Sequence, residues 1–192
     1  MATTDVNVGK LGKIILYEDK NFQGRSYECM SDCADMSPYL SNCQSCKVAH
    51  GCFMVYDRPN FTGNQVFMKK GEYADYMSMM GMTSGIKSCR IIPVQQMGVY
   101  KIRLFEKENL KGQMHELMND CDNIEDRLHM SECKSCNVLD GHWLLYEQPL
   151  FKGKMAYLMP GEYKSLREMG NLSKIMSLRC IMDMWLDAVF HK

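Results

Sequence analysis

Two cysteine pairs have the spacing that metal sites use. Cys43 and Cys46 form one CxxC pair, and Cys133 and Cys136 form another. Two such pairs are the donor set of a structural zinc site, in which four thiolates bind the ion tetrahedrally. However, 86 residues lie between Cys46 and Cys133, whereas the halves of such a site are usually about 12–20 residues apart. We therefore expect no zinc site, and thiol or zinc binding is the least favoured of the functions considered.

A third pair, Cys29 and Cys33, is spaced for redox chemistry. Residues four apart on a strand and its exit can bring two thiols together, so a disulfide is open to this pair. The alternative is that both are small apolar core residues, a common role of free cysteines. Ten cysteines in 192 residues are too few for a disulfide scaffold, and thiols stay reduced in the cytosol. We favour the core role.

Catalytic and cofactor-binding motifs are absent from the sequence. The histidines form no HExxH pair and accompany no nucleophile elbow, and no glycine-rich loop could hold a phosphate. A lone histidine beside a turn is more often a solvated side chain than a catalytic one. We therefore expect no enzyme activity and no cofactor. The five histidines are His50, His115, His129, His142 and His191.

A pattern of aromatic residues and glycine recurs four times along the chain. In its first copy, Phe22 follows Tyr17 after five positions, and Gly24 follows two positions later. The four glycines are 39, 49 and 41 residues apart, and a serine follows them by 21, 25, 23 and 24 residues. A repeat of about 40 residues with two fixed points indicates an array of structural units. The copies are Tyr17, Phe22, Gly24 and Ser45; Tyr56, Phe61, Gly63 and Ser88; Phe105, Leu110, Gly112 and Ser135; and Tyr146, Phe151, Gly153 and Ser177.

Each copy predicts a hairpin that folds over itself. Glycine can adopt positive φ without a steric cost, the two rings can stack at the bend, and the serine hydroxyl can bond the folded-over backbone. Lys13–Tyr17 reads as a strand because it is β-branched and apolar. His50–Gly51 and Gly71–Tyr73 predict turns, and Ile124–Leu128 and Ser165–Met169 predict single helical turns. Many short strands without a long helix indicate an all-β sandwich.

The chain resembles the βγ-crystallins, and the lens γ-crystallins in particular. The segments that carry the resemblance are Tyr17–Gly24, Asp57–Gly63 and Gly71–Tyr73, and it extends from about Lys13 to Met182. The composition, with 19 methionines and two tryptophans, is similar to the γM crystallins of fish lenses. The resemblance implies two γ-crystallin-like domains, each a sandwich of two Greek-key motifs. It also makes Tyr73 a tyrosine corner.

The repeat and the resemblance together set the expected domain limits. The longer middle gap between the glycines indicates two pairs of repeats joined by a linker. The role of the last ten residues stays open, because γ-crystallins usually end before them. We expect an N-terminal arm at 1–12, a first domain at 13–93 with Greek keys 13–51 and 52–93, a linker at 94–99, a second domain at 100–182 with Greek keys 100–141 and 142–182, and a C-terminal extension at 183–192.

The resemblance also implies how residues from distant parts of the chain meet. It places three cysteines in one cluster, in which Cys29 and Cys33 lie near Cys89, and it leaves open whether any of them form a disulfide. It further implies that apolar residues on equivalent strands of the two domains pair the domains. These interface residues are Met54, Phe67 and Ile92 in the first domain, and Leu144, Tyr157 and Ile181 in the second.

Calcium binding by a stress module of the same fold is the main functional alternative. Many microbial βγ-crystallins bind the ion through two Asn or Asp residues, two variable positions, a Ser or Thr, and then the repeat serine. Ca²⁺ prefers several oxygen ligands, including charged ones. The acidic pair is missing from all four copies, so we expect no calcium site. In its place stand Leu40 and Ser41, Thr83 and Ser84, Met130 and Ser131, and Leu172 and Ser173.

Charge and hydropathy exclude several partners. Lys and Arg together number 23, as do Asp and Glu, whereas nucleic acids and anionic membranes attract proteins with a basic excess. No run of 18 apolar residues could span a membrane, and the first nine residues lack the parts of a signal peptide. We expect a monomeric protein of the lens fibre cell cytoplasm. It would be a structural and refractive constituent of the eye lens that contacts other lens crystallins through weak short-range forces.

Methionine stands where lens γ-crystallins usually carry tryptophan. Phe53 and Met79 occupy the two tryptophan positions of the first domain, and Trp143 and Met169 those of the second. Methionine is flexible and has a polarizable sulfur, so it could sustain the refractive increment and lubricate close protein contacts. The alternative is drift among tolerated apolar residues. Met77–Met82 holds four methionines in six residues, too many for one buried face, so we expect some to be exposed.

Overall fold

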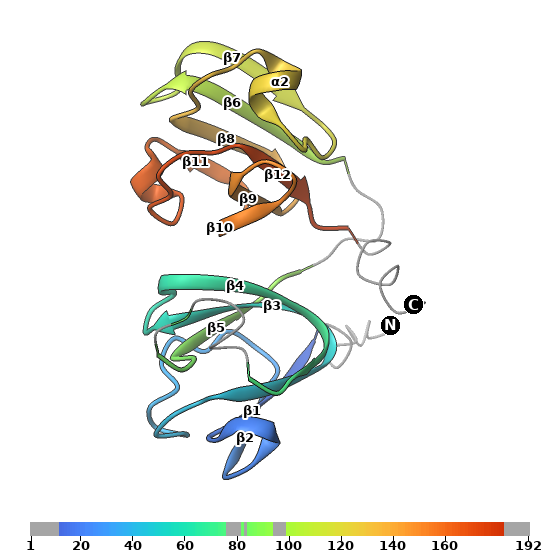
Figure 1. The fold of residues 1–192 in the computed structure, drawn as a ribbon, viewed down its shortest axis with the longest axis vertical. Coiled ribbons are helices and arrows are strands. Elements are labelled where there is room, and N and C mark those ends of the chain that lie inside the picture. Colours follow the sequence, from blue (N-terminus) through green and yellow to red (C-terminus); the bar gives the residue numbers. More distant parts are fainter. Residues whose placement is uncertain (1–11, 76–81, 83, 94–98, 183–192) are drawn as a thin grey trace, which may run out of the picture. The chain divides into compact units, whose positions relative to one another are not determined.

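A computed structural model of the chain describes residues 12–75, 82, 84–93 and 99–182. The chain divides into two compact units, Met1–Pro93 and Val94–Lys192, and antiparallel strands dominate each of them (Figure 1). Most of the expected arm and linker, and the whole C-terminal extension, lie outside the described residues. Within the described part of the chain, no helix has the length and apolar character needed to cross a membrane.

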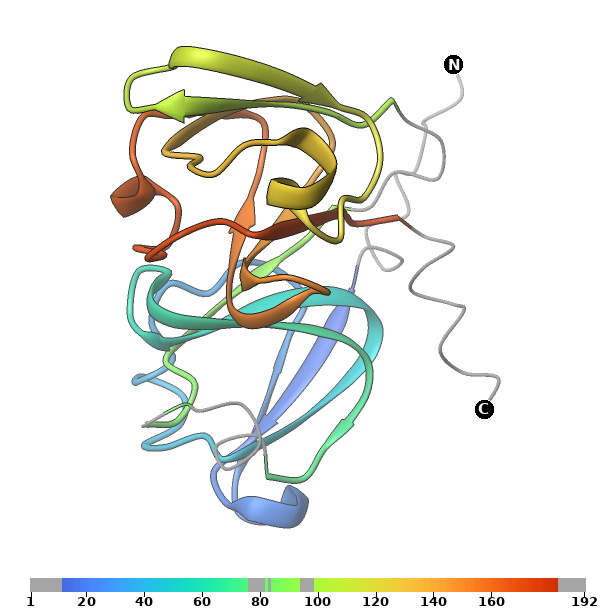
Figure 2. The same cartoon turned by 45° about the horizontal axis from the view of Figure 1, so that its top comes forward.

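Five strands form one sheet in the first unit. β1 (Lys13–Tyr17) pairs with β2 (Ser26–Cys29) on one side and with β3 (Ser45–Arg58) on the other. β3 also pairs with β4 (Thr62–Tyr73) and with β5 (Ser88–Ile91). Figure 2 shows β3 and β4 as long curved ribbons. This curvature lets a single sheet enclose a core.

Two turns predicted for the first unit are wrong. His50–Gly51 lies inside β3, and Gly71–Tyr73 is the end of β4. The reason is that the two strands bend together: their pairing shifts register between Val48 and Cys52, and Gly51 has a φ of +69°. A β-bulge bends a strand in this way without ending it. The predicted limit between the first two Greek keys therefore falls within one continuous strand.

The second unit divides the equivalent pairing between two sheets. One sheet has the strand order β11-β8-β6-β7, and the other has the order β10-β9-β12. β11 follows β10 in the chain but pairs with β8, so the second Greek key contributes a strand to the sheet of the first. The strands are β6 (Lys101–Lys107), β7 (Lys111–Leu117), β8 (Ser135–Asp140), β9 (Trp143–Gln148), β10 (Lys152–Leu158), β11 (Gly161–Tyr163) and β12 (Ser177–Cys180).

Three single helical turns complete the described elements. α2 (Ile124–Leu128) and η3 (Leu166–Glu168) confirm the two predicted helical turns, and η2 (Lys20–Phe22) belongs to the first bend. α2 begins where the Asn123 side chain accepts a hydrogen bond of 3.1 Å from the Asp126 N–H. Such a cap satisfies a backbone donor that a helix leaves without a partner.

Each unit has a core of its own. Along β1, Ile14 and Leu16 are fully buried while Lys13 and Ile15 are partly exposed, because successive side chains of a strand point to opposite faces. The all-β fold of two Greek-key sandwiches is thereby confirmed. Large core side chains are Phe53 and Met68 in the first unit, and Trp143, Leu145 and Met169 in the second.

Candidate functional site

The repeat serine closes the first bend with two hydrogen bonds. Ser45, at the start of β3, is fully buried. Its Oγ accepts a hydrogen bond of 3.0 Å from the Phe22 N–H and donates one of 2.5 Å to the Asp19 carbonyl. Because a hydroxyl is both donor and acceptor, one side chain satisfies two backbone groups of the folded-over turn. We call this arrangement the serine clamp.

All four repeats contain the serine clamp. The accepted hydrogen bonds of the other three are 3.1, 3.0 and 3.0 Å long, and the donated ones are 2.6, 2.5 and 2.6 Å long. All four serines have no exposed surface. The pattern of aromatic, glycine and serine residues therefore marks one repeated structural device. The further clamps join Ser88 to Phe61 and Arg58, Ser135 to Leu110 and Lys107, and Ser177 to Phe151 and Gln148.

The backbone of each bend is left-handed at three positions. Gly24 has a φ of +79°, and Asn21 and Phe22 before it have φ values of +57° and +60°. A left-handed conformation costs a residue with a side chain roughly 1–2 kcal/mol, so the clamp must offset strain. Sequence reasoning missed the residue before the second aromatic position. Its signal was asparagine, which tolerates this region, in three of four repeats: Asn21, Asn60 and Asn109, with Leu150 in the fourth.

Three of the bends carry an aromatic pair covered by a cation. The rings of Tyr17 and Phe22 meet edge to face, with centroids 5.7 Å apart, and the Lys47 ammonium lies 4.4 Å from the Phe22 centroid. Sequence reasoning missed this cation. Its signal was a Lys or Arg two residues after the repeat serine in three of the four copies. In the second bend, the guanidinium carbon of Arg90 lies 4.1 Å from the ring centroid of Phe61, which pairs with Tyr56. In the fourth bend, that of Arg179 lies 4.2 Å from the ring centroid of Phe151, which pairs with Tyr146.

The third bend keeps the serine clamp without the aromatic and cationic layers. Leu110 replaces the second ring, and Asn137 stands where the other repeats have the cation. Phe105, which would form the first half of the pair, lies opposite Met114 in the β6–β7 ladder. The bend itself is unchanged, since Leu110 has a φ of +58° and Gly112 has a φ of +82°.

Tyrosine corners close the end of one strand in each unit. The Tyr73 hydroxyl donates a hydrogen bond of 2.8 Å to the Lys69 carbonyl, and burial raises the pKa of Tyr73 to about 12. The Tyr163 hydroxyl donates a bond of 2.7 Å to the Met159 carbonyl and accepts one of 3.0 Å from the Met159 N–H. Both hydroxyls are used to hold backbone groups.

The residues predicted to pair the domains are neighbours within each unit. Met54 lies opposite Phe67 in the β3–β4 ladder, and Leu144 lies opposite Tyr157 in the β9–β10 ladder. By the alternation of a strand, Met54 points away from the core residues on either side of it. None of the six predicted residues belongs to either core. At equivalent places, Ile92 and Ile181 donate backbone hydrogen bonds of 3.0 and 2.9 Å to Cys52 and His142.

The two CxxC pairs are core residues of different units. Cys43 and Cys46 pack into the first core, and Cys133 and Cys136 pack into the second. Burial raises the pKa of Cys46 and of Cys136 well above its ordinary value, which disfavours the thiolates that zinc requires. Among residues 12–75, 82, 84–93 and 99–182, no group of three or more His, Cys, Asp and Glu side chains could hold a metal ion.

The cysteine cluster implied by the family resemblance forms in the first unit. The sulfurs of Cys29 and Cys89 are 3.9 Å apart, and Cys33 forms a backbone bridge with Cys89. The Cys89 thiol donates to Cys29, and this bond together with burial raises the pKa of Cys89. The same bond lowers the pKa of Cys29. All three are free thiols.

In two of the loops where a calcium ion would bind, a carboxylate takes part in internal hydrogen bonds. Glu18 accepts hydrogen bonds of 3.3 and 3.2 Å from the N–H and hydroxyl of Ser41, and it forms an ion pair of 2.9 Å with Arg25. The bond from Arg25 is also the main cause of the lowered pKa of Glu18. In the fourth repeat, the Ser173 hydroxyl donates a bond of 2.7 Å to Glu147. These single carboxylates are a poor set for Ca²⁺, which prefers six to eight oxygen ligands.

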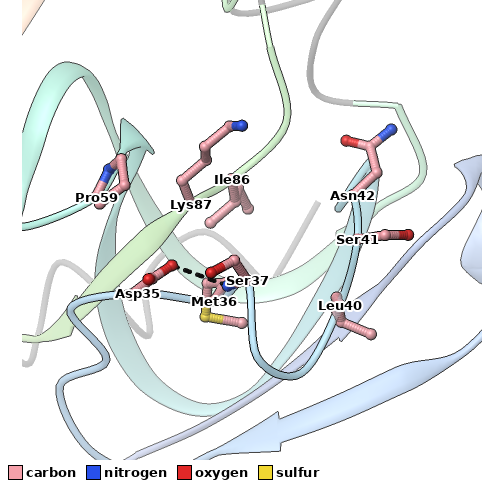
Figure 3. A pocket seen from close by; sticks show the side chains of 9 residues that line it. All are labelled: Asp35, Met36, Ser37, Leu40, Ser41, Asn42, Pro59, Ile86 and Lys87. Carbon is pink, nitrogen blue, oxygen red and sulfur yellow. Dashed lines mark hydrogen bonds between the residues drawn. The ribbon is translucent and has the colours of Figure 1, made fainter.

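A small pocket lies beside the second bend (Figure 3). It has a volume of about 160 Å³ and separates the 35–42 segment from Pro59 and Ile86. On one wall, Asp35 accepts a hydrogen bond of 2.9 Å from the Ser37 N–H. Pockets for small molecules usually have about 300–1,000 Å³, so this one is too small to define a ligand site.

The positions expected to carry tryptophan are core positions. Phe53, Trp143 and Met169 are fully buried, and the Trp143 indole donates a hydrogen bond of 3.1 Å to the Asp140 carbonyl. Met79 lies outside the described residues. Of the stretch expected to expose methionine, Met82 alone lies among the described residues, and it is buried.

Comparison with known proteins places this arrangement in a family. The Beta/Gamma crystallin family model matches residues 13–92 and 101–181, so the chain belongs to the βγ-crystallins. Within the family it is 60% identical over 175 residues to gamma-crystallin M3 of Cyprinus carpio, with 91% of this chain and 99% of the relative covered. It is 56% identical over 178 residues to gamma-crystallin M1 of Chiloscyllium indicum, with the same coverage. Identity to gamma-crystallin B of Homo sapiens is 46% over 176 residues, covering 91% of this chain and all of the relative.

Proposed function

We propose that the chain is a structural, refractive constituent of the eye lens, without catalysis. The observation that carries this function is the match to gamma-crystallins M3 and M1 across both units. The site supports it, because the four buried serines and the two corner tyrosines bond backbone groups. Their role is to hold a fold in place, and a refractive protein needs nothing else of them.

The proposed setting is the cytoplasm of lens fibre cells, where the chain is a monomer at high concentration. The net charge of zero keeps long-range repulsion between copies small, although it also weakens colloidal protection. Contacts with other crystallins are then weak and short-ranged. A proteome survey of tissues tests the setting: the account requires strong enrichment in the lens, and a protein without lens enrichment would contradict it.

We propose further that exposed methionine supports transparency. Met30, Met114 and Met118 are 58%, 45% and 49% exposed. Their polarizable, weakly hydrated side chains raise the refractive increment and let neighbours approach without fixed contacts.

A triple change to leucine separates these two effects. Met30→Leu, Met114→Leu and Met118→Leu together should lower the refractive increment and raise light scattering at high concentration. The matched control changes the buried Met36, Met82 and Met130 to leucine, which alters composition equally but leaves the surface intact. It should lower the refractive increment by the same amount without raising the scattering. If the exposed variant keeps both quantities within error of the parent, methionine is only a filler.

The six predicted interface residues are proposed to join the two domains. The supporting observation is that each unit carries an apolar group on the sheet face opposite to its core, with Met54 beside Phe67 and Leu144 beside Tyr157. Burying a Phe side chain stabilises by up to about 3 kcal/mol. Phe67→Ala should therefore uncouple the domains in denaturant and give two separate transitions. Val66→Ala, a change at the neighbouring core position, should weaken the first domain without this uncoupling. Coincident transitions in Phe67→Ala would refute the interface.

A further inference from the structure

Two tyrosines of the first unit form a parallel stack at the surface. Tyr27 on β2 and Tyr39 in the loop before β3 have ring centroids 4.0 Å apart and ring planes inclined by 7°. The three aromatic pairs of the bends are instead inclined by 66°, 67° and 66°. Tyr39 is 47% exposed, although Tyr27 covers one of its faces. The exposed part therefore lies on its other face and on the ring edge.

The outer face of Tyr39 lacks the cover that the other aromatic pairs have. In each of the three bends with an aromatic pair, a Lys or Arg of the same repeat lies 4.1–4.4 Å from the centroid of the second ring, which is Phe22, Phe61 or Phe151. Within the described part of the chain, no cation lies over Tyr39 or Tyr27. A cation over an aromatic face is attracted by the ring quadrupole. The Tyr39 face is thus a ring face without the cation that covers a ring in three of the bends.

The charge around the stack also favours a cation. The segment 26–42, which contains both tyrosines, has the carboxylates Glu28, Asp32 and Asp35 and no Lys, Arg or His. Lys13 pairs with Glu28 at 3.3 Å, and the charge of Lys87 acts on Asp35. Asp32 accepts a backbone hydrogen bond from Ile91 and has no ion pair among the described residues.

We infer that the outer face of Tyr39 binds the guanidinium group of an arginine on a second copy of this chain. A planar guanidinium stacks on a ring, whereas a lysine ammonium is a compact, strongly hydrated charge. Two exposed arginines, Arg58 and Arg167, form no ion pair with the described residues and can supply the group. A single contact of this kind is weak, so copies form it in number only at high protein concentration. The inference rests on the proposed function for that one condition.

The second virial coefficient from light scattering tests the contact. Tyr39→Leu should weaken attraction between copies, with a roughly two- to five-fold loss of contact affinity, whereas Tyr39→Phe should preserve it. Val99→Ala is the control, since it removes another exposed apolar side chain of 58% exposure, and it should differ from Tyr39→Leu. The double variant Arg58→Lys and Arg167→Lys keeps the charge and should match Tyr39→Leu. Attraction unchanged in either Tyr39→Leu or the arginine variant would overturn the inference, as would an equal loss in Val99→Ala.

A titration of the parent protein gives a second readout that needs no variant. N-acetyl-arginine amide should shift the ring resonances of Tyr39 in the NMR spectrum more than those of other exposed rings, and N-acetyl-lysine amide at equal concentration should shift them less. Equal shifts from the two probes would overturn the arginine assignment. Neither experiment depends on the tissue of expression, so failure here and failure of the lens assignment are distinguishable.

Discussion

The third bend and the other three reach the same backbone by different means. Leu110 and Phe61 have φ values of +58° and +58°, and their N–H groups donate bonds of 3.0 and 3.1 Å to the clamp serines. Of these two bends, only that of Phe61 has an aromatic pair with a cation over it. The serine clamp and the glycine therefore suffice to form the bend. The aromatic and cationic layers add stability to a geometry that is already set.

The two missing layers of the third bend are missing together. Leu110 replaces the ring, and Asn137 replaces the cation that Lys47 and Arg90 supply elsewhere. A cation gains little over an aliphatic side chain, because the attraction comes from the ring quadrupole. The third bend thus shows which parts of the repeat depend on one another and which do not.

The largest effect is expected from removing a clamp. Ser88→Ala and Ser135→Ala each leave a buried N–H and a carbonyl without their partner, at a cost of roughly 1–3 kcal/mol for each group. Because the clamp is common to both bends, the two variants should lose similar stability in denaturant unfolding. Ser131→Ala, at an exposed position of the same loop, should change stability little. A much smaller loss in Ser135→Ala than in Ser88→Ala would show that the bends are not equivalent.

A smaller effect is expected from exchanging the outer layers. Phe61→Leu with Arg90→Asn converts the second bend into a copy of the third, and should lose about 1–2 kcal/mol of the free energy of unfolding. Leu110→Phe with Asn137→Arg makes the reverse change, and should gain less, since Phe105 already has Met114 as its cross-strand neighbour. The single variants complete a double-mutant cycle, in which ring and cation should be coupled. Additive single effects would mean that the two layers act independently.

The sequence predicts the repeat framework well because few residue types can satisfy it. Glycine at a φ of +79° to +84° and a buried serine with two backbone bonds have strict requirements, and such requirements leave a visible pattern. The cations over Phe22, Phe61 and Phe151 are also visible as a position of the repeat, but a surface Lys or Arg attracts no notice until its ring is placed below it.

The errors of the prediction concern how strands end. His50–Gly51 has the composition of a turn, and at its counterpart, Asp140–Gly141, β8 does end before β9 begins at Trp143. In the first unit the chain instead bends within β3, with a register shift against β4. Whether a bend ends a strand depends on the partner strand following it, which is a property of the pair and not of the local sequence. The carboxylate of Glu18 at Ser41 was missed for a similar reason, since it is 23 residues away in the chain.

Native-state hydrogen exchange of the clamped amides tests most directly whether the clamp sets the bend. The N–H groups of Leu110 and Phe151 lie in the same unit and donate to Ser135 and Ser177 over 3.0 Å each. If the clamp alone holds the bend, the two amides should have protection factors within about tenfold of each other, a difference of about 1.4 kcal/mol in opening free energy. Exchange of the Leu110 amide faster than that of Phe151 by about a hundredfold or more would contradict the account, because it would show that a bend without its aromatic and cationic layers opens on its own.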